Sequence, residues 1–97
     1  MNEYDKRQYR LMIKIVEVNK LDINSLGKII ISLEALLGQL KEPDQEWVKT
    51  FQRVWGKLED IYSFNIVEKK TSLSQQEIEW ITQALKELRT SIQMKLN

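Results

Sequence analysis

The sequence contains no cysteine, no histidine and only one proline. A chain without cysteine forms no disulfide and has no thiolate nucleophile, and without histidine it also lacks the zinc sites that these two residues usually build. The absence of histidine further removes the side chain that most often transfers protons near neutral pH. These absences exclude many classes of enzyme, and we expect no catalytic residue, no metal site and no cofactor.

The chain also lacks an excess of positive or negative charge. Its 15 lysines and arginines nearly balance its 14 aspartates and glutamates, for a net charge of +1. The charges are also spread evenly along the chain. Proteins that bind nucleic acid directly carry a cationic excess that neutralises phosphates. We therefore expect no nucleic-acid partner.

Long apolar runs are missing as well. No unbroken apolar run is longer than that of residues 29–31, which is far shorter than the roughly 20 residues that span a bilayer. The N-terminal stretch MNEYDKRQYR is polar and does not resemble the apolar part of a signal peptide. We expect a cytoplasmic protein that has neither a membrane partner nor a small-molecule substrate.

The composition that remains is that of an ordinary globular protein, with 42% hydrophobic and 30% charged residues. Chains usually divide into several domains only well above a length of 97 residues. We therefore predict a single helical domain over residues 1–97.

Three segments repeat apolar residues every three or four positions, the spacing that places side chains on one face of an α-helix. We predict helices at residues 25–40, at about 44–62 and at about 75–96. Their predicted buried faces are Leu26, Ile29, Ile30, Leu33, Leu36, Leu37 and Leu40; Trp47, Val48, Phe51, Val54, Trp55, Leu58, Ile61 and Tyr62; and Ile78, Ile81, Leu85, Leu88 and Ile92.

Side chains that can cap a helix precede each of these segments. Asp22, Asn24 or Ser25 can cap the first through a side-chain oxygen. The stretch SQQE predicts a capping box in which Ser74 and Glu77 bond each other's backbone N–H groups.

The N-terminal segment, residues 4–18, is ambiguous. Its β-branched residues alternate as in a strand, but Tyr4, Leu11, Met12, Ile15 and Val18 fit one face of a helix. A lone strand would leave its backbone without hydrogen-bond partners, so we predict a helix. Four amphipathic helices with short connections predict an all-α fold, an antiparallel up-down four-helix bundle.

One longer connection, residues 63–74, contains four apolar side chains. Because these side chains avoid water, we expect the connection to fold back on the bundle. They are Phe64, Ile66, Val67 and Leu73.

Around the single proline, Glu42, Asp44 and Glu46 bring three carboxylates into a short stretch. Proline and acidic residues are favoured in the first turn of a helix, so we predict that this corner is a helix start with Asp44 as its cap. An acidic corner that binds a partner is the alternative.

Glu59 and Asp60 are adjacent and therefore about 100° apart on a helix, which favours a solvated face over a convergent catalytic pair.

The three tryptophans and two mid-helix glycines admit two interpretations each. Trp47, Trp55 and Trp80 either seal the bundle or serve as exposed anchors for another protein; we favour sealing.

Gly38 and Gly56 each cost about 1 kcal/mol relative to alanine in a helix, so we expect close helix approach, with a flat patch for a partner as the alternative.

A longer pattern runs through LDINSLGKIIISLEALLGQL, EWVKTFQRVWGKLEDIY and LSQQEIEWITQALKELRTSI. Its most distinctive part is the spacing W…F…W..LE..Y, carried by Trp47, Phe51, Trp55, Leu58, Glu59 and Tyr62. Over about residues 20–93 the chain resembles the small helical immunity proteins that accompany polymorphic toxins, including those of bacterial contact-dependent growth inhibition (CDI). The resemblance implies a cytoplasmic protein that binds the toxic C-terminal domain of a large effector, often a nuclease, and blocks its active site in a one-to-one complex.

We expect a partner surface on the acidic corner and its neighbouring helices, and a small helical adaptor or subunit without a toxin partner is the alternative function. The candidate partner-binding residues are Glu42, Asp44, Glu46, Trp47, Glu59, Asp60 and Trp80.

Overall fold

The computed structural model describes all of residues 1–97 and contains four α-helices and no strand. The helices are α1 (Glu3–Val16), α2 (Ile23–Gly38), α3 (Gln45–Val67) and α4 (Gln75–Leu96). The all-α fold is therefore confirmed, and the ambiguous N-terminal segment is a helix. None of the four helices combines the length and the apolar character needed to cross a bilayer.

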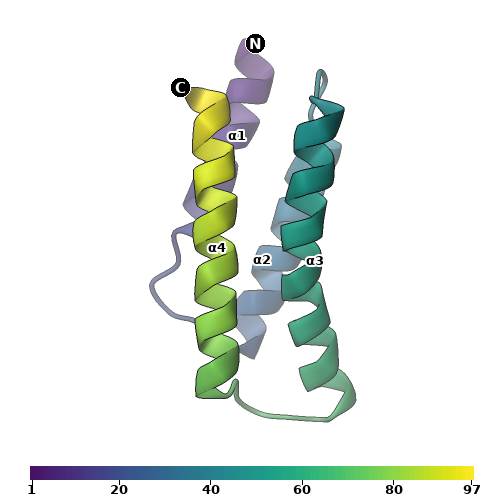
Figure 1. The fold of residues 1–97 in the computed structure, drawn as a ribbon, viewed down its shortest axis with the longest axis vertical. Helices are drawn as coiled ribbons and strands as arrows, with labels where there is room; N and C mark the ends of the chain where they lie inside the picture. The colour runs from purple at the N-terminus through teal and green to yellow at the C-terminus, as the bar shows by residue number, and fades with distance from the viewer.

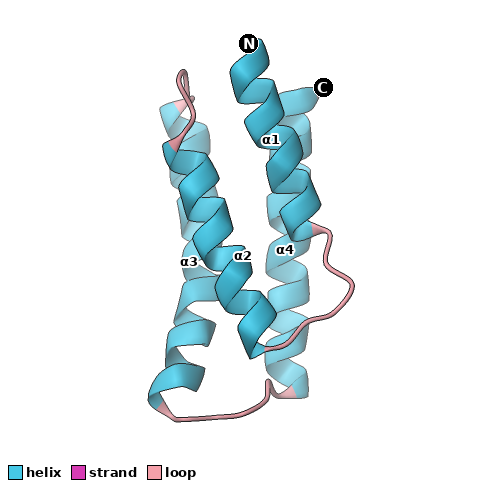
Figure 2. Cartoon of the chain, turned by 180° about the vertical axis from the view of Figure 1, so that it is seen from behind, coloured by secondary structure: helices cyan, strands magenta, loops and turns pink.

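The helices pack as a bundle in which α1 and α3 each contact both α2 and α4. The bundle is elongated, with extents of 42 × 22 × 18 Å. Both chain ends and the α2–α3 connection lie at one end of it, and the α3–α4 connection lies at the other (Figures 1 and 2). The end that holds the chain termini is called the terminal end below.

The core is built from the faces that the spacing of apolar residues predicts in α2, α3 and α4. The aliphatic side chains with no exposed surface on these helices are Leu26, Leu33, Leu58, Ile81, Leu88 and Ile92. Ile31, which lies off the predicted face of α2, is 71% exposed. Burying each of these aliphatic side chains favours folding by about 1.5–3 kcal/mol.

The predicted face of α1 was right only in part: Met12 is buried and Ile15 and Val18 pack against the core. Leu11 is 44% exposed, whereas Tyr9, Met12 and Val16 are buried together with two polar residues, Asp5 and Gln8. The polar residues interrupt the apolar pattern of the buried face. The spacing of apolar residues alone therefore places the exposed Leu11 on the buried face and leaves Asp5 and Gln8 out of it.

The helix α3 runs to Val67, about five residues further than predicted, so that part of the expected connection is helical. Phe64, Ile66 and Val67 are at least half exposed, and only Leu73 packs against the core. The prediction that all four apolar side chains fold back on the bundle was therefore wrong. Just after the helix, Lys69 adopts a positive φ of 54°, and the N–H of Lys70 donates to the carbonyl of Asn65 at 2.9 Å. This is a Schellman arrangement with lysine where glycine is usual.

The prediction of close helix approach at Gly38 and Gly56 was also wrong, because a Cβ atom at either position would meet nothing within 4 Å. The close approach occurs instead at Gly27, where a Cβ would lie 2.8 Å from the ring of Tyr62. The α2–α3 seam therefore depends on the glycine that the spacing of apolar residues did not single out.

Replacing Lys69 with glycine should raise the free energy of unfolding by about 0.5–1 kcal/mol, because glycine adopts a positive φ without steric cost. Urea denaturation followed by circular dichroism measures the change. Lys70→Gly is the matched control and should give no gain, since φ at that residue is not positive. A gain of equal size in both variants would contradict the assignment.

Gly56→Ala should stabilise the protein by about 0.5–1 kcal/mol through helix propensity alone. Gly27→Ala should instead destabilise it by about 1 kcal/mol, because the ring of Tyr62 must shift away from the new Cβ atom. The same denaturation experiment tests both variants. Equal gains in the two would show that Gly27 is not needed for packing.

Candidate functional site

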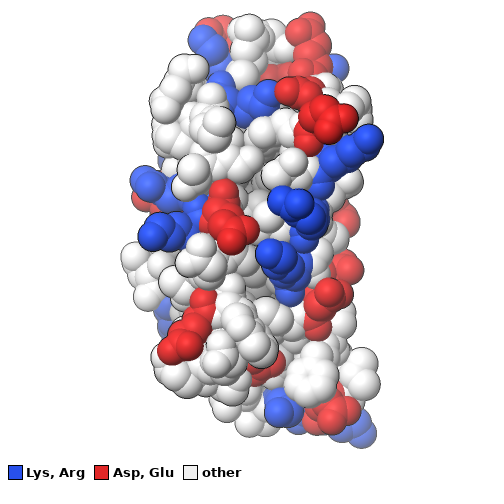
Figure 3. All heavy atoms as spheres, viewed as in Figure 1, with Lys and Arg blue, Asp and Glu red and all other residues white.

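A groove follows the seam between α3 and α4. It consists of two hollows of about 670 and 330 Å³ that share the lining residues Gln83 and Glu87. We call it the α3–α4 groove. Figure 3 shows the face that carries it, where acidic and basic side chains are interspersed with uncharged surface. The larger hollow has the size of a typical ligand site.

The buried carboxylate of Asp5 holds the terminal end of the groove in place. Its two oxygens accept hydrogen bonds from the backbone N–H groups of Lys41 and Glu42, each at 2.9 Å. Burial raises the pKa of Asp5, but these hydrogen bonds lower it by more, so the pKa of Asp5 lies below its ordinary value of 3.8. The α2–α3 connection is thereby fastened to the first turn of α1.

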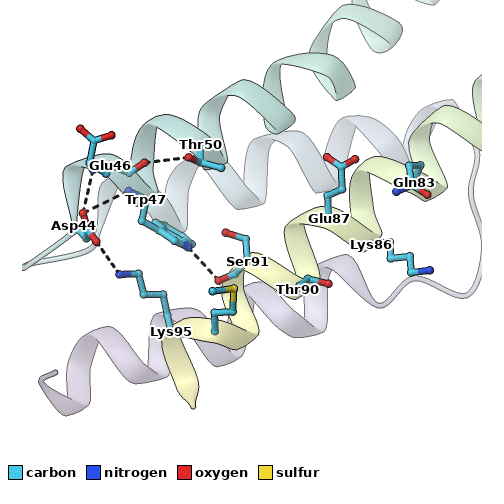
Figure 4. A pocket seen from close by; sticks show the side chains of 11 residues that line it. Asp44, Glu46, Trp47, Thr50, Gln83, Lys86, Glu87, Thr90, Ser91 and Lys95 are labelled. Carbon is cyan, nitrogen blue, oxygen red and sulfur yellow. Dashed lines mark hydrogen bonds and ion pairs between the residues drawn. The ribbon is translucent and has the colours of Figure 1, made fainter.

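Asp44 caps α3, as predicted. Its carboxylate accepts the N–H of Glu46 at 3.0 Å and, at the longer distance of 3.5 Å, the N–H of Trp47. Its other oxygen lies 3.2 Å from Nζ of Lys95, in the last turn of α4. The hydrogen bond from Lys95, together with the backbone N–H groups, holds the pKa of Asp44 below its ordinary value. Figure 4 shows these contacts across the groove.

Trp47 forms the floor of the larger hollow. Its ring packs edge-on against Tyr9, with centroids 5.2 Å apart, and tilts against Phe51 at 5.1 Å. Its indole N–H donates to the carbonyl of Ser91 at 3.1 Å (Figure 4). Trp47 therefore seals the α3–α4 seam, and only part of its surface faces the groove.

Trp80 lines the smaller hollow and differs from the other two tryptophans. The indole of Trp55 donates to the carbonyl of Ile30 at 3.0 Å and closes the α2–α3 seam. Trp80 is 56% exposed and makes no such hydrogen bond within the chain. The sealing role that we favoured thus holds for Trp47 and Trp55 and is wrong for Trp80.

A second buried polar contact fixes the start of α4, one turn before Trp80. The fully buried Asn65 donates to the carboxylate of Glu77 at 2.7 Å. Glu77 also accepts the N–H of Ser74 at 2.9 Å, which confirms the predicted capping box. The hydrogen bond from Ser74 is the main reason that the pKa of Glu77 lies below its ordinary value of 4.5, against the opposing effect of burial.

The structure brings together five of the seven candidate partner-binding residues. Asp44, Glu46 and Trp47 line the larger hollow, and Asp60 and Trp80 line the smaller one. The other two, Glu42 and Glu59, line neither hollow.

Sequence reasoning missed Gln83, Glu87, Met94 and Lys95, which all lie on α4. Of these, only Met94 gives a local signal. It is an apolar residue off the buried face of its helix, and it is 71% exposed. The other three are recognised only once α4 is placed beside α3.

The groove offers hydrogen-bonding and aromatic groups. Glu59 and Asp60 are both exposed, and only Asp60 faces the groove. The acidic side chains of the chain form no group of three that could hold a metal ion.

The spacing W…F…W..LE..Y has a packing explanation. Phe51 and Leu58 are buried, while Trp47, Trp55 and Tyr62 pack against the core from its edges. Only Glu59 is left on the surface.

Comparison of the chain with protein-family models, with curated proteins and with solved structures gave no match.

Asp5→Asn should lower the free energy of unfolding by about 2 kcal/mol at neutral pH, because an uncharged amide cannot accept both backbone N–H groups equally well. Asp60→Asn, at an exposed position of the groove, is the control and should change it little.

The pH dependence supplies an independent check. Because the pKa of Asp5 is lower in the folded state than in the unfolded state, its stabilisation is complete above about pH 5 and is lost as the pH falls through the folded pKa. The stability difference between the wild type and Asp5→Asn should therefore shrink in acid. A difference that is independent of pH would contradict the role of the carboxylate.

Proposed function

We propose that this chain is an immunity protein that binds a cognate bacterial toxin domain, of the nuclease type, through the α3–α4 groove. The resemblance to helical immunity proteins implies the partner, and the exposed Trp80 in the groove is the observation that carries the choice of surface. Binding in a one-to-one complex would block the toxin's active site. The protein acts in the cytoplasm and contributes no chemical step, cofactor or metal.

The groove has the composition of a protein interface. Tryptophan contributes more than most residues to binding energy, and interface centres combine aromatic anchors with surrounding polar groups. Trp80 and Met94 supply exposed apolar surface towards the two ends of the groove. Thr50, Gln83 and Thr90 supply hydrogen-bonding groups between them. Against a nuclease, the carboxylates of Asp44 and Glu46 would stand in for substrate phosphates.

The proposal includes the antiparallel up-down order of the four helices. It is supported by the position of both chain termini and the α2–α3 connection at one end of the bundle (Figure 1). It is also supported by the hydrogen bonds that join the first turn of α3 to the last turns of α4. In this order α3 and α4 are neighbours along their length, which makes the groove continuous.

One further observation favours the alternative, a small helical adaptor or subunit. Phe64, Ile66 and Val67 expose apolar surface at the end of α3, far from the terminal end. Apolar surface of this kind is typical of association with another chain. An adaptor would use that end, whereas an immunity protein of the kind proposed would use the groove.

Co-expression with the toxin domains encoded beside its gene tests the proposal. The wild-type chain should rescue growth, and Trp80→Ala should weaken binding by about 30-fold, the effect of losing an aromatic anchor worth roughly 2 kcal/mol. Ile31→Ala removes an apolar side chain of α2 that is even more exposed, at 71% against 56% for Trp80, and is the control.

Calorimetry with the purified toxin domain gives the affinities, and circular dichroism confirms that both variants fold. Rescue from none of these toxins would contradict the proposed function. Full affinity in Trp80→Ala, with loss of affinity in Phe64→Ala, would instead move the contact surface to the end of α3.

A further inference from the structure

The larger hollow of the α3–α4 groove already contains a cation, the side chain of Lys95. Its Nζ lies 3.2 Å from the carboxylate of Asp44 and 5.9 Å from the ring centroid of Trp47 (Figure 4). A carboxylate beside an aromatic face is an arrangement that binds ammonium and guanidinium groups. Lys95 therefore marks the place where this hollow holds positive charge.

This internal cation is held weakly. Lys95 lies in the last turn of α4, and helix ends fray. The side chain of Lys95 is 24% exposed, but that of Asp44 is 54% exposed, so water and salt reach the carboxylate and screen the attraction. Such ion pairs shift an equilibrium by only about two- to five-fold. A competing cation can displace Lys95 at small cost.

The hollow is also larger than one lysine side chain requires, at about 670 Å³. Glu87 lines it and forms no ion pair within the chain, while Glu46 is paired only with the exposed Lys49 at 3.9 Å. When Lys95 leaves, three carboxylates and only one cation, Lys86, remain along the hollow. The emptied site therefore favours a positively charged guest.

We infer that the space between Asp44 and Trp47 is a binding site for an arginine side chain of a protein partner, and that Lys95 occupies it in the unbound protein. Guanidinium fits better than ammonium because it is planar, stacks on an indole ring and bonds a carboxylate with two N–H groups. The inference rests on the proposed function, since it names the partner chemistry that this part of the groove selects.

The test uses the full chain labelled with ¹⁵N and N-acetyl-arginine amide as the probe. Its neutral analogue, N-acetyl-citrulline amide, has nearly the same shape. The arginine probe should shift the indole N–H signal of Trp47 in a saturable way at millimolar concentration. The indole signal of Trp55, which lies in the α2–α3 seam, is the internal reference and should not move.

Two substitutions separate displacement of Lys95 by the arginine probe from simple attraction of the probe to Asp44. Lys95→Gln removes the internal competitor and should tighten binding of the arginine probe by about three-fold. Asp44→Asn should weaken it by about five-fold or more, yet it preserves the helix start because asparagine caps helices as well as aspartate does. An unchanged Trp55 signal in both variants shows that the bundle is intact.

Equal shifts with the citrulline probe, or Lys95→Gln binding no tighter than the wild type, would overturn the inference. These outcomes are distinct from failure of the proposed function, which is measured by growth rescue. A chain that rescues growth without selecting the arginine probe would retain its function and lose only this site.

Discussion

The carboxylate of Asp5 is the contact on which the terminal end of the bundle depends. It is 1% exposed and accepts the backbone N–H groups of Lys41 and Glu42, so it fastens the α2–α3 connection to α1. The start of α3 follows directly in the chain, and with it the cap Asp44 and the ring of Trp47. Because Trp47 packs between Tyr9 of α1 and Ser91 of α4, one buried charge places the residues that form the larger hollow.

Polar contacts at both ends and apolar packing between them give the bundle a defined register. The contact of Asn65 with Glu77 joins α3 to α4 at the end opposite Asp5. A helix that slipped along its neighbour would leave one of these buried polar groups without a partner, at a cost of about 1–3 kcal/mol. The groove lies along the α3–α4 seam, where Thr50, Ala84 and Ser91 are among the lining residues, whereas the indole of Trp55 closes the seam between α2 and α3.

The all-α fold, the faces of α2, α3 and α4, and the caps Asp44 and Ser74 could be predicted because local spacing and capping chemistry determine them. The face of α1 could be predicted only in part, since Asp5 and Gln8 are polar residues at buried positions. The end of α3 was missed because Lys69 adopts a conformation for which glycine is the usual signal. Asp44, Glu46, Trp47, Asp60 and Trp80 could be proposed from their residue types. That these residues line one groove with Gln83, Glu87 and Lys95 depends on the packing of α3 against α4, which local sequence does not encode.

The central claim is that the α3–α4 groove is the working surface, and the absence of cysteine permits a direct test. A single cysteine at Gln83, shared by both hollows, or at the exposed Ala35 of α2 can be coupled to a bulky maleimide in otherwise identical proteins. Binding of the purified toxin domain is then measured by calorimetry. The account predicts that the adduct on Gln83→Cys abolishes binding and that the adduct on Ala35→Cys leaves it intact; the reverse result would contradict it.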